Sequence, residues 1–400
     1  MRILFLSRWF PYPANNGSKL RIYNLLHGLG CVHAVDLVSF YDPAEGPADL
    51  DGLRGICQSV KAVAWREFDP ASLSALRGLF GSTPRSVVDT YSPEMSRVVK
   101  DALDARPYDL LIASQIDMAP YAVEQAEIPI LLEEAEVGVY AQKATRPSSW
   151  MGRLRHGLTW WKYRQYLHGL FRNITASTVV SEQEKKLLQS AVSEAHKVTV
   201  IPNCMQLQDY AGVTAVPDPG SLIYTGSFRY DVNYEAMLWF VREVFPLILL
   251  DHPQAALTIT GDPAGKPLPV AKNVTQTGVV ADVRPLVAAA RVALAPLQTG
   301  GGTRLKILEA MALRTPVVST SKGAEGLDAQ PGEHLLVADS PQDFAEAVLR
   351  LLQDDDLHRR IAEGGFALVS QKFNWDAVLP GFLRLVEDAA HAGNNPDSGR

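Results

Sequence analysis

The sequence has little cysteine and no long apolar run, and both shortages exclude whole classes of protein. Its 400 residues include only three cysteines, Cys31, Cys57 and Cys204. Three widely spaced cysteines form neither a disulfide framework nor a metal-ligand cluster, which suits a reducing cytoplasm. The most apolar stretch, MLWFVREVFPLILL (237–250), is interrupted by charged residues and a proline, so it is not expected to span a bilayer.

An excess of positive charge is also missing. The formal net charge is −6 at pH 7, which argues against a general nucleic-acid binder. The first residues, MRILFLSRWFPYP, have a short apolar run that an arginine and then a proline interrupt, unlike a secretory signal peptide. We therefore expect a cytoplasmic protein without a nucleic-acid partner.

What the sequence does contain is a regular alternation of strand-like and helical patterns over a length that suggests two domains. The strand-like runs cover residues 2–7, 34–40, 60–65, 109–114, 128–132 and 176–180, and then 221–226, 256–261, 274–278, 292–296, 315–320 and 334–339. Most are continuously apolar, as parallel strands buried on both faces are. The pattern predicts an α/β protein with two doubly wound parallel sheets.

The domain boundary is predicted where this alternation stops, in residues 200–221, which are rich in Pro, Gly and Asp. Near the end of the chain, we expect a helix over residues 376–392 that is broken at Pro380 and turns back onto the first domain. Residues 393–400 have no apolar content and are expected to be disordered. The predicted domains are residues 1–203 and 204–375.

Three strands of the second half end in glycine, at Gly226, Gly261 and Gly278. Each one alone is consistent with an ordinary turn after a strand. Ligands of open parallel sheets bind at the carboxyl ends of the strands, where loops approach closely. Three glycines at equivalent positions therefore favour a ligand cleft.

The stretch TGGGTRLKILEAMAL (299–313) follows another strand with a glycine loop and a helix. Thr303 is predicted to cap this helix, with Arg304 and Lys306 in its first turn. Cations are unfavourable there, because the N-terminus of a helix already carries positive partial charge. A phosphate would reverse that penalty, and glycine lets backbone N–H groups reach it. Glu309, on the same helical face as Lys306, is placed to accept hydrogen bonds from sugar hydroxyls.

An alternative interpretation of this stretch stays open: a glycine-rich turn with solvated cations and Glu309 paired to Lys306. The run matches neither the Walker pattern nor GxGxxG. It therefore indicates a phosphate-bearing ligand without nucleotide hydrolysis or hydride transfer.

Six segments together resemble glycosyltransferase family 4, which contains retaining sugar-nucleotide transferases with the GT-B fold. They are WFPYPANNGSKLRIYNLLHGL (9–29), VVSEQEKKLL (179–188), VIPNCMQ (200–206), LIYTGSFRYDVNYEAMLWF (222–240), GGGTRLKILEAMALRTPVVSTSKGAEGL (300–327) and FNWDAVL (373–379). The resemblance covers nearly the whole chain, and the segment 300–327, similar to the donor-binding motif, is the most specific. It implies two Rossmann-like domains that face a cleft, with the donor nucleotide mostly on the second.

The resemblance also implies roles for single residues. Arg304 and Lys306 would neutralise the leaving diphosphate, and Glu309 would bind the ribose hydroxyls. The other donor-binding residues implied are Gly17, Gly226, Ser227, Arg229, Gly300, Gly301, Gly302 and Thr303. Such enzymes generally need no metal or other cofactor, only a nucleotide-diphosphate sugar as co-substrate, because basic side chains and a helix N-terminus stabilise the departing charge. Retention at the anomeric carbon without a protein nucleophile is implied as well.

The chain departs from the family pattern at two places. Gly301 stands where many members have a sugar-binding glutamate, which puts the identity of the donor sugar in doubt. Where many members have a histidine after the strand 109–114, this chain has Ser114, Gln115 and Asp117. These absences leave a non-catalytic sugar-nucleotide-binding module as an alternative.

An acidic cluster, Glu133, Glu134 and Glu136, follows the strand 128–132, where another family histidine often stands. We predict that it holds an acceptor hydroxyl, with Glu134 accepting the proton. The alternative is a solvated acidic loop.

The stretch WMGRLRHGLTWWKYRQYLHGLFR (150–172) interleaves aromatic and basic residues. One interpretation is a helix that buries its aromatic side chains while its cations reach solvent. The other is peripheral contact with an anionic membrane, because Trp and Arg suit that interface.

The sequence thus predicts a glycosyltransferase that moves a hexose from a nucleotide-diphosphate sugar to a glycan or lipid-linked acceptor in cell-surface or exopolysaccharide synthesis. A sugar-nucleotide epimerase or a phosphorylase on the same fold is the other enzymatic alternative.

Overall fold

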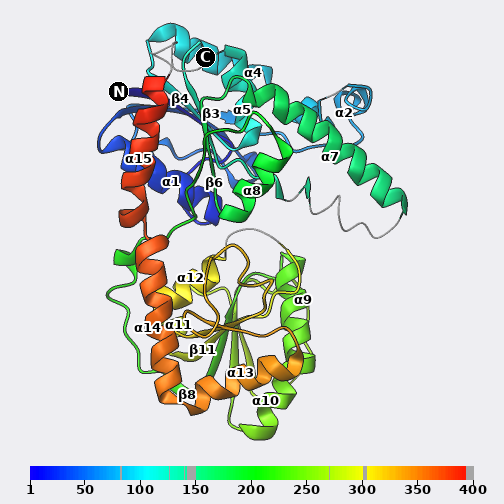
Figure 1. Cartoon of the computed structure of the whole chain (residues 1–400), viewed down its shortest axis with the longest axis vertical. Helices are drawn as coiled ribbons and strands as arrows, with labels where there is room; N and C mark the ends of the chain where they lie inside the picture. The colour runs from blue at the N-terminus through cyan, green and yellow to red at the C-terminus, as the bar shows by residue number, and fades with distance from the viewer. Residues whose placement is uncertain are drawn as a thin grey trace. The chain divides into compact units, whose positions relative to one another are not determined.

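The computed structural model describes residues 1–81, 83–125, 127–138, 140–141, 150–269, 271–300 and 304–392. The chain divides into two compact units (Figure 1). The first consists of residues Met1–Pro202 and Leu379–Arg400, and the second of residues Asn203–Val378. The predicted boundaries, after residues 203 and 375, lie within three residues of these.

The first unit is built on a seven-stranded parallel sheet with the order β3-β2-β1-β4-β5-β6-β7. Its strands are β1 (Arg2–Ser7), β2 (Ala34–Tyr41), β3 (Ser59–Ala64), β4 (Leu110–Ser114), β5 (Ile130–Glu133), β6 (Ala176–Val179) and β7 (Val198–Val200). Every residue of β4, and all but the first of β1, is buried, because helices cover both faces of the sheet. The continuous apolar runs of the sequence follow from this double burial.

The helices of the first unit are α1 (Gly17–Gly30), α2 (Leu73–Arg77), α3 (Arg85–Thr90), α4 (Pro93–Ala105), α5 (Ala119–Gln125), α7 (Trp150–Phe171), α8 (Glu182–Ala191) and the part of α15 (Trp375–Ala392) from Leu379 onward. In α15, the side chain of Leu379 packs against Gly28 of α1, where a Cβ atom would lie only 2.7 Å from Leu379 Cδ2. A larger residue at position 28 would therefore displace the Leu379 side chain.

The second unit is built on a six-stranded parallel sheet with the order β10-β9-β8-β11-β12-β13. Its strands are β8 (Asp218–Thr225), β9 (Ala256–Thr260), β10 (Val274–Gly278), β11 (Ala290–Ala295), β12 (Val317–Ser319) and β13 (Leu336–Val337). Its helices are α9 (Asp231–Trp239), α10 (Phe245–Asp251), α11 (Arg284–Ala288), α12 (Leu305–Ala312), α13 (Pro341–Gln353) and α14 (Asp355–Lys372), with a π-helical segment η5 (Phe240–Val244) between α9 and α10.

Both sheets reverse their strand order at one point, between β1 and β4 in the first unit and between β8 and β11 in the second. Open parallel sheets bind ligands at such a point, beside the carboxyl ends of the strands. The two doubly wound parallel sheets predicted from the sequence are therefore confirmed, and their topology indicates where to look for a site in each unit.

Three local predictions are wrong. Helix α15 is not broken at Pro380 but runs through it, since a proline removes one backbone hydrogen bond and the rest of the helical ladder continues. Helix α12 begins at Leu305 with Arg304 at its N-cap, so Thr303 is not the cap and Arg304 precedes the first turn. Strand β7 was missed, because its three residues lie at the edge of the segment assigned to the domain boundary.

Candidate functional site

The carboxyl ends of β8 and β9 come so close together that only glycine fits between them. A Cβ atom on Gly261 would lie 2.5 Å from the carbonyl oxygen of Gly226, and φ of Gly261 is +130°. A Cβ atom on Gly226 would lie 2.9 Å from Nζ of Lys306. Gly278 differs, because its φ of +70° favours glycine but a Cβ atom there would contact nothing within 4 Å. Two of the three strand-end glycines thus mark a close backbone approach, and the third marks a turn.

Lys306, in the first turn of α12, points back to these strand ends. Its Nζ donates hydrogen bonds to Tyr224 Oη at 2.8 Å and to Asn233 Oδ1 at 3.0 Å. Asn233 is itself held, because its Nδ2 donates to the carbonyl oxygen of Ser227 at 2.9 Å. Burial, and next the positive charge of Arg304, lower the pKa of Lys306 to about 7. Among the residues that the structure describes, no carboxylate forms an ion pair with Lys306.

Arg304 is buried and connects the glycine loop to the segment after β12. Its Nη2 donates to the carbonyl oxygens of Lys322 at 2.8 Å and Gly300 at 3.4 Å, and lies 3.9 Å from a carboxylate oxygen of Glu325. Burial lowers its pKa, and the charge of Glu325 opposes that effect. Arg304 therefore positions the loop and adds positive charge beside Lys306.

The glycine loop itself is described only at its first residue. Gly300 has φ of +91°, and a Cβ atom there would lie 3.1 Å from Cγ1 of Val232 in α9. Both features favour glycine. Gly301, Gly302 and Thr303 lie outside the described residues.

Glu309 lies one turn further along α12. Tyr210 Oη donates to its Oε1 at 3.4 Å, and burial raises the pKa of Glu309. The Lys306–Glu309 ion pair of the alternative interpretation is absent between these two described side chains, because each has its own partners. The two helical neighbours thus present separate cationic and acidic groups.

Ser227 and Arg229 lie in the loop after β8. The Ser227 hydroxyl accepts a hydrogen bond from the backbone N–H of Arg229 at 3.2 Å. The guanidinium of Arg229 is largely exposed and pairs with Asp262, in the loop after β9. These contacts order the loop beside the two glycines.

In the first unit, Gly17 is the first residue of α1, after an N-cap at Asn16 whose Oδ1 accepts from the backbone N–H of Lys19 at 3.0 Å. The nearby acidic cluster separates into residues with different surroundings. Both carboxylate oxygens of Glu133 are bonded inside the protein, to Arg21 Nε at 2.6 Å and Ser114 Oγ at 2.7 Å. Glu133 is therefore occupied in a closed, buried network.

Glu134 differs from Glu133 in burial, backbone conformation and hydrogen-bond partner. It is half-buried, its φ is +56°, and Gln115 Nε2 donates to its Oε2 at 3.0 Å. Gln115 also has a positive φ, +71°, so two neighbouring strand exits carry strained non-glycine residues, as functional sites often do. Burial raises the pKa of Glu134 to about 7. Glu136 is exposed.

Arg8, directly after β1, is a candidate that the sequence reasoning missed. Its guanidinium carbon lies 3.4 Å from the ring centroid of Trp65 and 4.2 Å from that of Trp9. Its Nη1 is buried and has no hydrogen-bond partner among the described residues. Burial lowers its pKa to about 10. Its only sequence signal was a cation at the exit of a buried strand.

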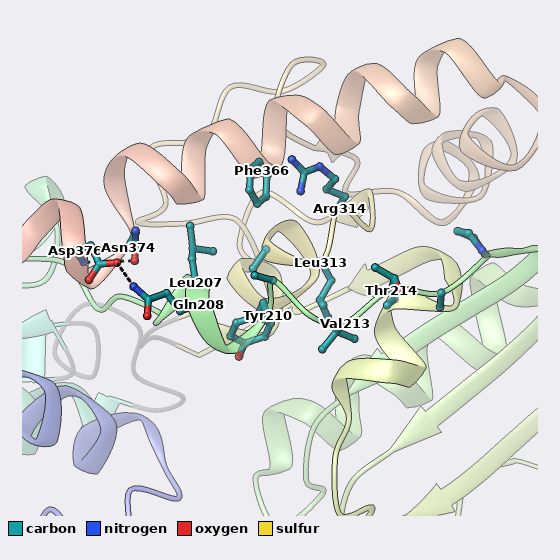
Figure 2. A pocket seen from close by; sticks show the side chains of 15 residues that line it. Leu207, Gln208, Tyr210, Val213, Thr214, Leu313, Arg314, Phe366, Asn374 and Asp376 are labelled. Atoms are coloured by element: carbon teal, nitrogen blue, oxygen red, sulfur yellow. Dashed lines mark hydrogen bonds between the residues drawn. The ribbon is translucent and has the colours of Figure 1, made fainter.

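A groove of about 620 Å³ lies elsewhere in the second unit, between residues 207–217, the end of α12 and α14. Figure 2 shows Leu207, Tyr210 and Leu313 on its walls, with Phe366 of α14. Its lining is mostly apolar, and it reaches α12 at the helix end opposite to Lys306. Tyr210 connects the groove to Glu309 through its hydroxyl.

Within the described residues, neither a metal-binding cluster nor a membrane-spanning helix is present. No group of three or more His, Cys, Asp or Glu side chains in the described ranges is arranged to hold a metal ion. No helix in the same ranges is both long and apolar enough to cross a membrane.

A known protein family matches part of the second unit. Residues 219–354 match the family described as Glycosyl transferases group 1. Over its whole length, the chain is similar to a protein of Klebsiella pneumoniae described as an uncharacterized 44.6 kDa protein in the cps region. The two are 23% identical, over 96% of this chain and 99% of the other.

Two solved structures are similar to the chain as a whole. Sucrose-phosphate synthase from Thermosynechococcus elongatus has a TM-score of 0.71 at 19% identity, over 98% of this chain and 100% of the other. HepE from Anabaena, solved in complex with UDP and glucose, has a TM-score of 0.65 at 16% identity, over 97% of this chain and 100% of the other. At these identities, the likeness establishes the fold.

Proposed function

From the premise that this chain has the GT-B fold and a glycosyl transferases group 1 domain in its second unit, we propose that it moves a hexose from a nucleotide-diphosphate sugar to an acceptor hydroxyl with retention. The observation that carries the proposal is the amine of Lys306. It lies half-buried at the switch point of a parallel sheet and is held by two neutral oxygens, so an anionic ligand would supply its missing counter-charge. Membership of glycosyltransferase family 4 in particular stays a prediction.

In the proposed reaction, the bond between the anomeric carbon and the diphosphate breaks, and a bond from that carbon to the acceptor oxygen forms. Negative charge develops on the leaving diphosphate. Lys306 would neutralise it together with Arg304, and the free N–H groups at the start of α12 would add hydrogen bonds. Gly226, Gly261 and Gly300 would let the diphosphate approach the backbone, and Gly301, Gly302 and Thr303 keep their predicted place in the same loop.

Glu309 would bind the ribose hydroxyls of the donor. Its side chain is partly buried, and Tyr210 fixes one carboxylate oxygen, which leaves the other oxygen to accept hydrogen bonds from a diol. Ser227 and Arg229 would contact the donor from the loop after β8, and Gly17 would contact it from the first unit.

In the first unit, we propose Glu134 as the group that holds the acceptor hydroxyl and takes its proton. A carboxylate with a pKa near 7 is well matched to proton transfer at neutral pH, and Gln115 fixes its orientation. Glu136 would add a contact to the acceptor. Glu133 would support the site through its hydrogen bonds with Arg21 and Ser114.

The relatives suggest which substrates to test first. HepE was solved with UDP and glucose, so UDP-glucose is our first candidate donor. The Klebsiella relative comes from the cps, or capsule, region, which supports a glycan or lipid-linked acceptor in polysaccharide synthesis. A lipid-linked acceptor would bring the cytoplasmic enzyme to the inner face of a membrane.

A thermal-shift series with UDP-, GDP- and ADP-sugars tests donor binding. A ligand at 100 times its dissociation constant stabilises a protein by about 2.7 kcal/mol, so the right nucleotide should raise the melting temperature clearly. The Lys306→Gln variant should lose most of the shift, whereas Lys266→Gln, at a lysine paired with Asp231, should keep it.

Release of nucleotide from the selected donor, with and without acceptor, then tests transfer. Acceptor-dependent release is the expected result. Binding without any release would favour the non-catalytic module, and formation of an epimeric nucleotide sugar would favour an epimerase. No shift with any nucleotide sugar would overturn the proposal.

A further inference from the structure

Arg8, the residue directly after β1, is a buried cation to which the proposed reaction gives no role. It is 8% exposed, and its guanidinium carbon lies close to the ring centroids of Trp65 and Trp9, at 3.4 and 4.2 Å. Aromatic rings attract a cation, but an indole supplies no oxygen or nitrogen acceptor for the five N–H donors of a guanidinium. These donors therefore need other partners.

The described part of the chain does not supply a counter-ion for Arg8. Its Nη1 is buried without a hydrogen bond, and no carboxylate of the described residues forms an ion pair with it. Three carboxylates attract its charge without pairing with it: Asp117, Asp42 and Glu67. Their attraction does not compensate for burial, which still lowers the pKa of Arg8 to about 10.

Lys19 shows that a neighbouring cation is treated differently. Arg8, Trp9 and Lys19 all border a small cavity of about 50 Å³ in the first unit. Lys19 is buried as well, but Glu45 pairs with it. Of these two buried cations, Arg8 is the one left without an anion, and the cavity provides space beside it.

The aromatic residues around Arg8 are themselves held in place. Trp65 contacts the fully buried ring of Phe40 edge to face, with centroids 5.0 Å apart. The Ser7 hydroxyl donates to the carbonyl oxygen of Trp9 at 2.7 Å and accepts from its backbone N–H at 3.3 Å. A guanidinium held between such residues is pre-organised, and its planar fork matches a carboxylate or phosphate with two parallel hydrogen bonds.

Arg8 also lies level with the proposed acceptor base. Strand β4 lies between β1 and β5, and the last residues of the three strands, Ser7, Ser114 and Glu133, are paired in register. Arg8 and Glu134 are the next residues after β1 and β5. Two strand spacings, about 10 Å, separate these positions, a distance that a glycan chain can span.

We propose that Arg8 recognises the carboxylate of an acidic sugar in the acceptor, near the hydroxyl that Glu134 would deprotonate. The guanidinium would bind the carboxylate through two parallel N–H···O hydrogen bonds while Trp9 and Trp65 keep its orientation. The acceptor would then be placed by its charge at Arg8 and by its reacting hydroxyl at Glu134.

A carboxylate suits this place better than a phosphate monoester. A phosphate monoester carries a charge of about −1.5 to −2 at pH 7, whereas a carboxylate carries a single negative charge. One negative charge balances Arg8. A second would meet the unpaired attraction of no further cation and would be repelled by the three carboxylates around Arg8, Asp117, Asp42 and Glu67.

This inference deepens the proposed function, because it rests on the proposed transfer and names the class of acceptor. Binding of an acidic sugar needs neither donor nor transfer, so the two proposals fail separately. If transfer is absent but an acidic sugar binds through Arg8, the acidic-sugar site stands. If transfer occurs equally well to neutral and acidic acceptors, only the acidic-sugar site is lost.

Binding of methyl glucuronide and methyl glucoside, which differ by a carboxylate in place of a hydroxymethyl group, tests the proposal. Tryptophan fluorescence of the full chain measures it, because Trp9 and Trp65 lie against Arg8. The glucuronide should bind at least about tenfold more tightly than the glucoside, since charge-assisted bidentate hydrogen bonds are much stronger than neutral ones.

Arg8→Gln should weaken glucuronide binding by about tenfold or more and leave glucoside binding unchanged, because it removes the charged fork. Arg8→Lys should restore part of the preference, since an ammonium keeps the charge but not the planar geometry. A merely structural stack would instead weaken both sugars together. In transfer assays, Arg8→Gln should raise KM for an acidic acceptor and leave KM for the nucleotide sugar unchanged.

Arg2→Gln is the matched control, because Arg2 is a cation at the opposite end of β1 and pairs with Asp36 at 3.5 Å. It should leave the binding of both sugars unchanged. The wild-type preference and Arg8→Lys keep the test decisive if Arg8→Gln does not fold.

The proposal is overturned by equal binding of the two sugars to the wild type, by no binding of the glucuronide, or by a preference that persists in Arg8→Gln. Tighter binding of glucose 6-phosphate than of the glucuronide would overturn it too, by assigning Arg8 to a phosphate. Loss of the nucleotide-sugar thermal shift in folded Arg8→Gln would do the same, by assigning Arg8 to the donor.

Discussion

Arg21 of the first unit and Lys306 of the second are cations near the carboxyl edges of their sheets, and the two have opposite surroundings. Arg21 in the first unit is 1% exposed and pairs with Glu133, a carboxylate that is 0% exposed. Lys306 in the second unit donates to a tyrosine hydroxyl and an asparagine oxygen. The first cation is neutralised inside the protein, and the second is not.

On this difference we base a structural role for Arg21 and the proposed anion-binding role for Lys306. A paired buried cation contributes to the folded state, and removing one partner leaves the other charge buried and uncompensated. A half-buried cation with neutral partners has no such compensation, and burial lowers the pKa of Lys306 to about 7. The predictions below test this contrast, from the largest expected effect to the smallest.

Arg21→Ala should destabilise the first unit by about 3–5 kcal/mol, because it leaves Glu133 without its counter-charge. Urea denaturation followed by tryptophan fluorescence measures this, since five of the seven tryptophans lie in the first unit. Lys100→Ala is the control, because the Lys100–Asp104 pair is exposed and should be worth less than about 0.5 kcal/mol. A loss as small as that of the control would show that the Arg21–Glu133 pair is not structural.

Lys306→Gln should lower kcat by about 10²–10³-fold while the unfolding free energy stays close to that of the wild type, because the substitution removes a charge that has no anionic partner to lose. Steady-state transfer kinetics and denaturation measure the two quantities. A variant that unfolds easily but retains its kcat would reverse the contrast between the two cations.

Glu134→Gln should lower kcat by about 10²-fold by removing the proposed base. In the wild type, kcat should rise with pH through about 7, because Glu134 must be deprotonated to accept a proton. The rise should disappear in the variant. Glu127→Gln, at an exposed glutamate before β5, serves as the control and should keep both kcat and its pH dependence. Unchanged turnover in Glu134→Gln would refute the role of the acidic cluster.

The affinity for the nucleotide sugar should be constant below pH 7 and fall by up to about tenfold per pH unit above it. The sign follows from the lowered pKa of Lys306: below about 7 the free amine is already charged, whereas above it the complex must take up a proton. Calorimetric titration between pH 6 and 9 measures the slope and the proton uptake. In Lys306→Gln, the affinity should be low and independent of pH over this range; a slope that persists would assign it to another group.

The sheets were predictable because burial on both faces leaves a strong sequence signal. The run at residues 2–7 coincides with β1, in which all residues but the first are buried, whereas β7, with three residues, was too short to give such a signal. The sequence singled out three strand-end glycines, but it did not show which two of them have close neighbours. Only packing distinguishes Gly226 and Gly261, which have close neighbours, from Gly278, which has none.

The sequence predicted which side chains belong to the site, but not their hydrogen-bond partners. The sequence of the acidic cluster does not show that Glu133 pairs with Arg21, which lies 112 positions earlier. Nor does it show that Glu134 adopts a positive φ and accepts a hydrogen bond from Gln115.

Helix α15 has a consequence for the folding of the protein during its synthesis on the ribosome. The first unit needs the residues from Leu379 onward, and Leu379 packs on Gly28 near the start of the chain. Domains tend to fold in the order of their synthesis. Here the unit that begins first receives its last helix only after the whole second unit has been translated, so the first unit completes its folding last.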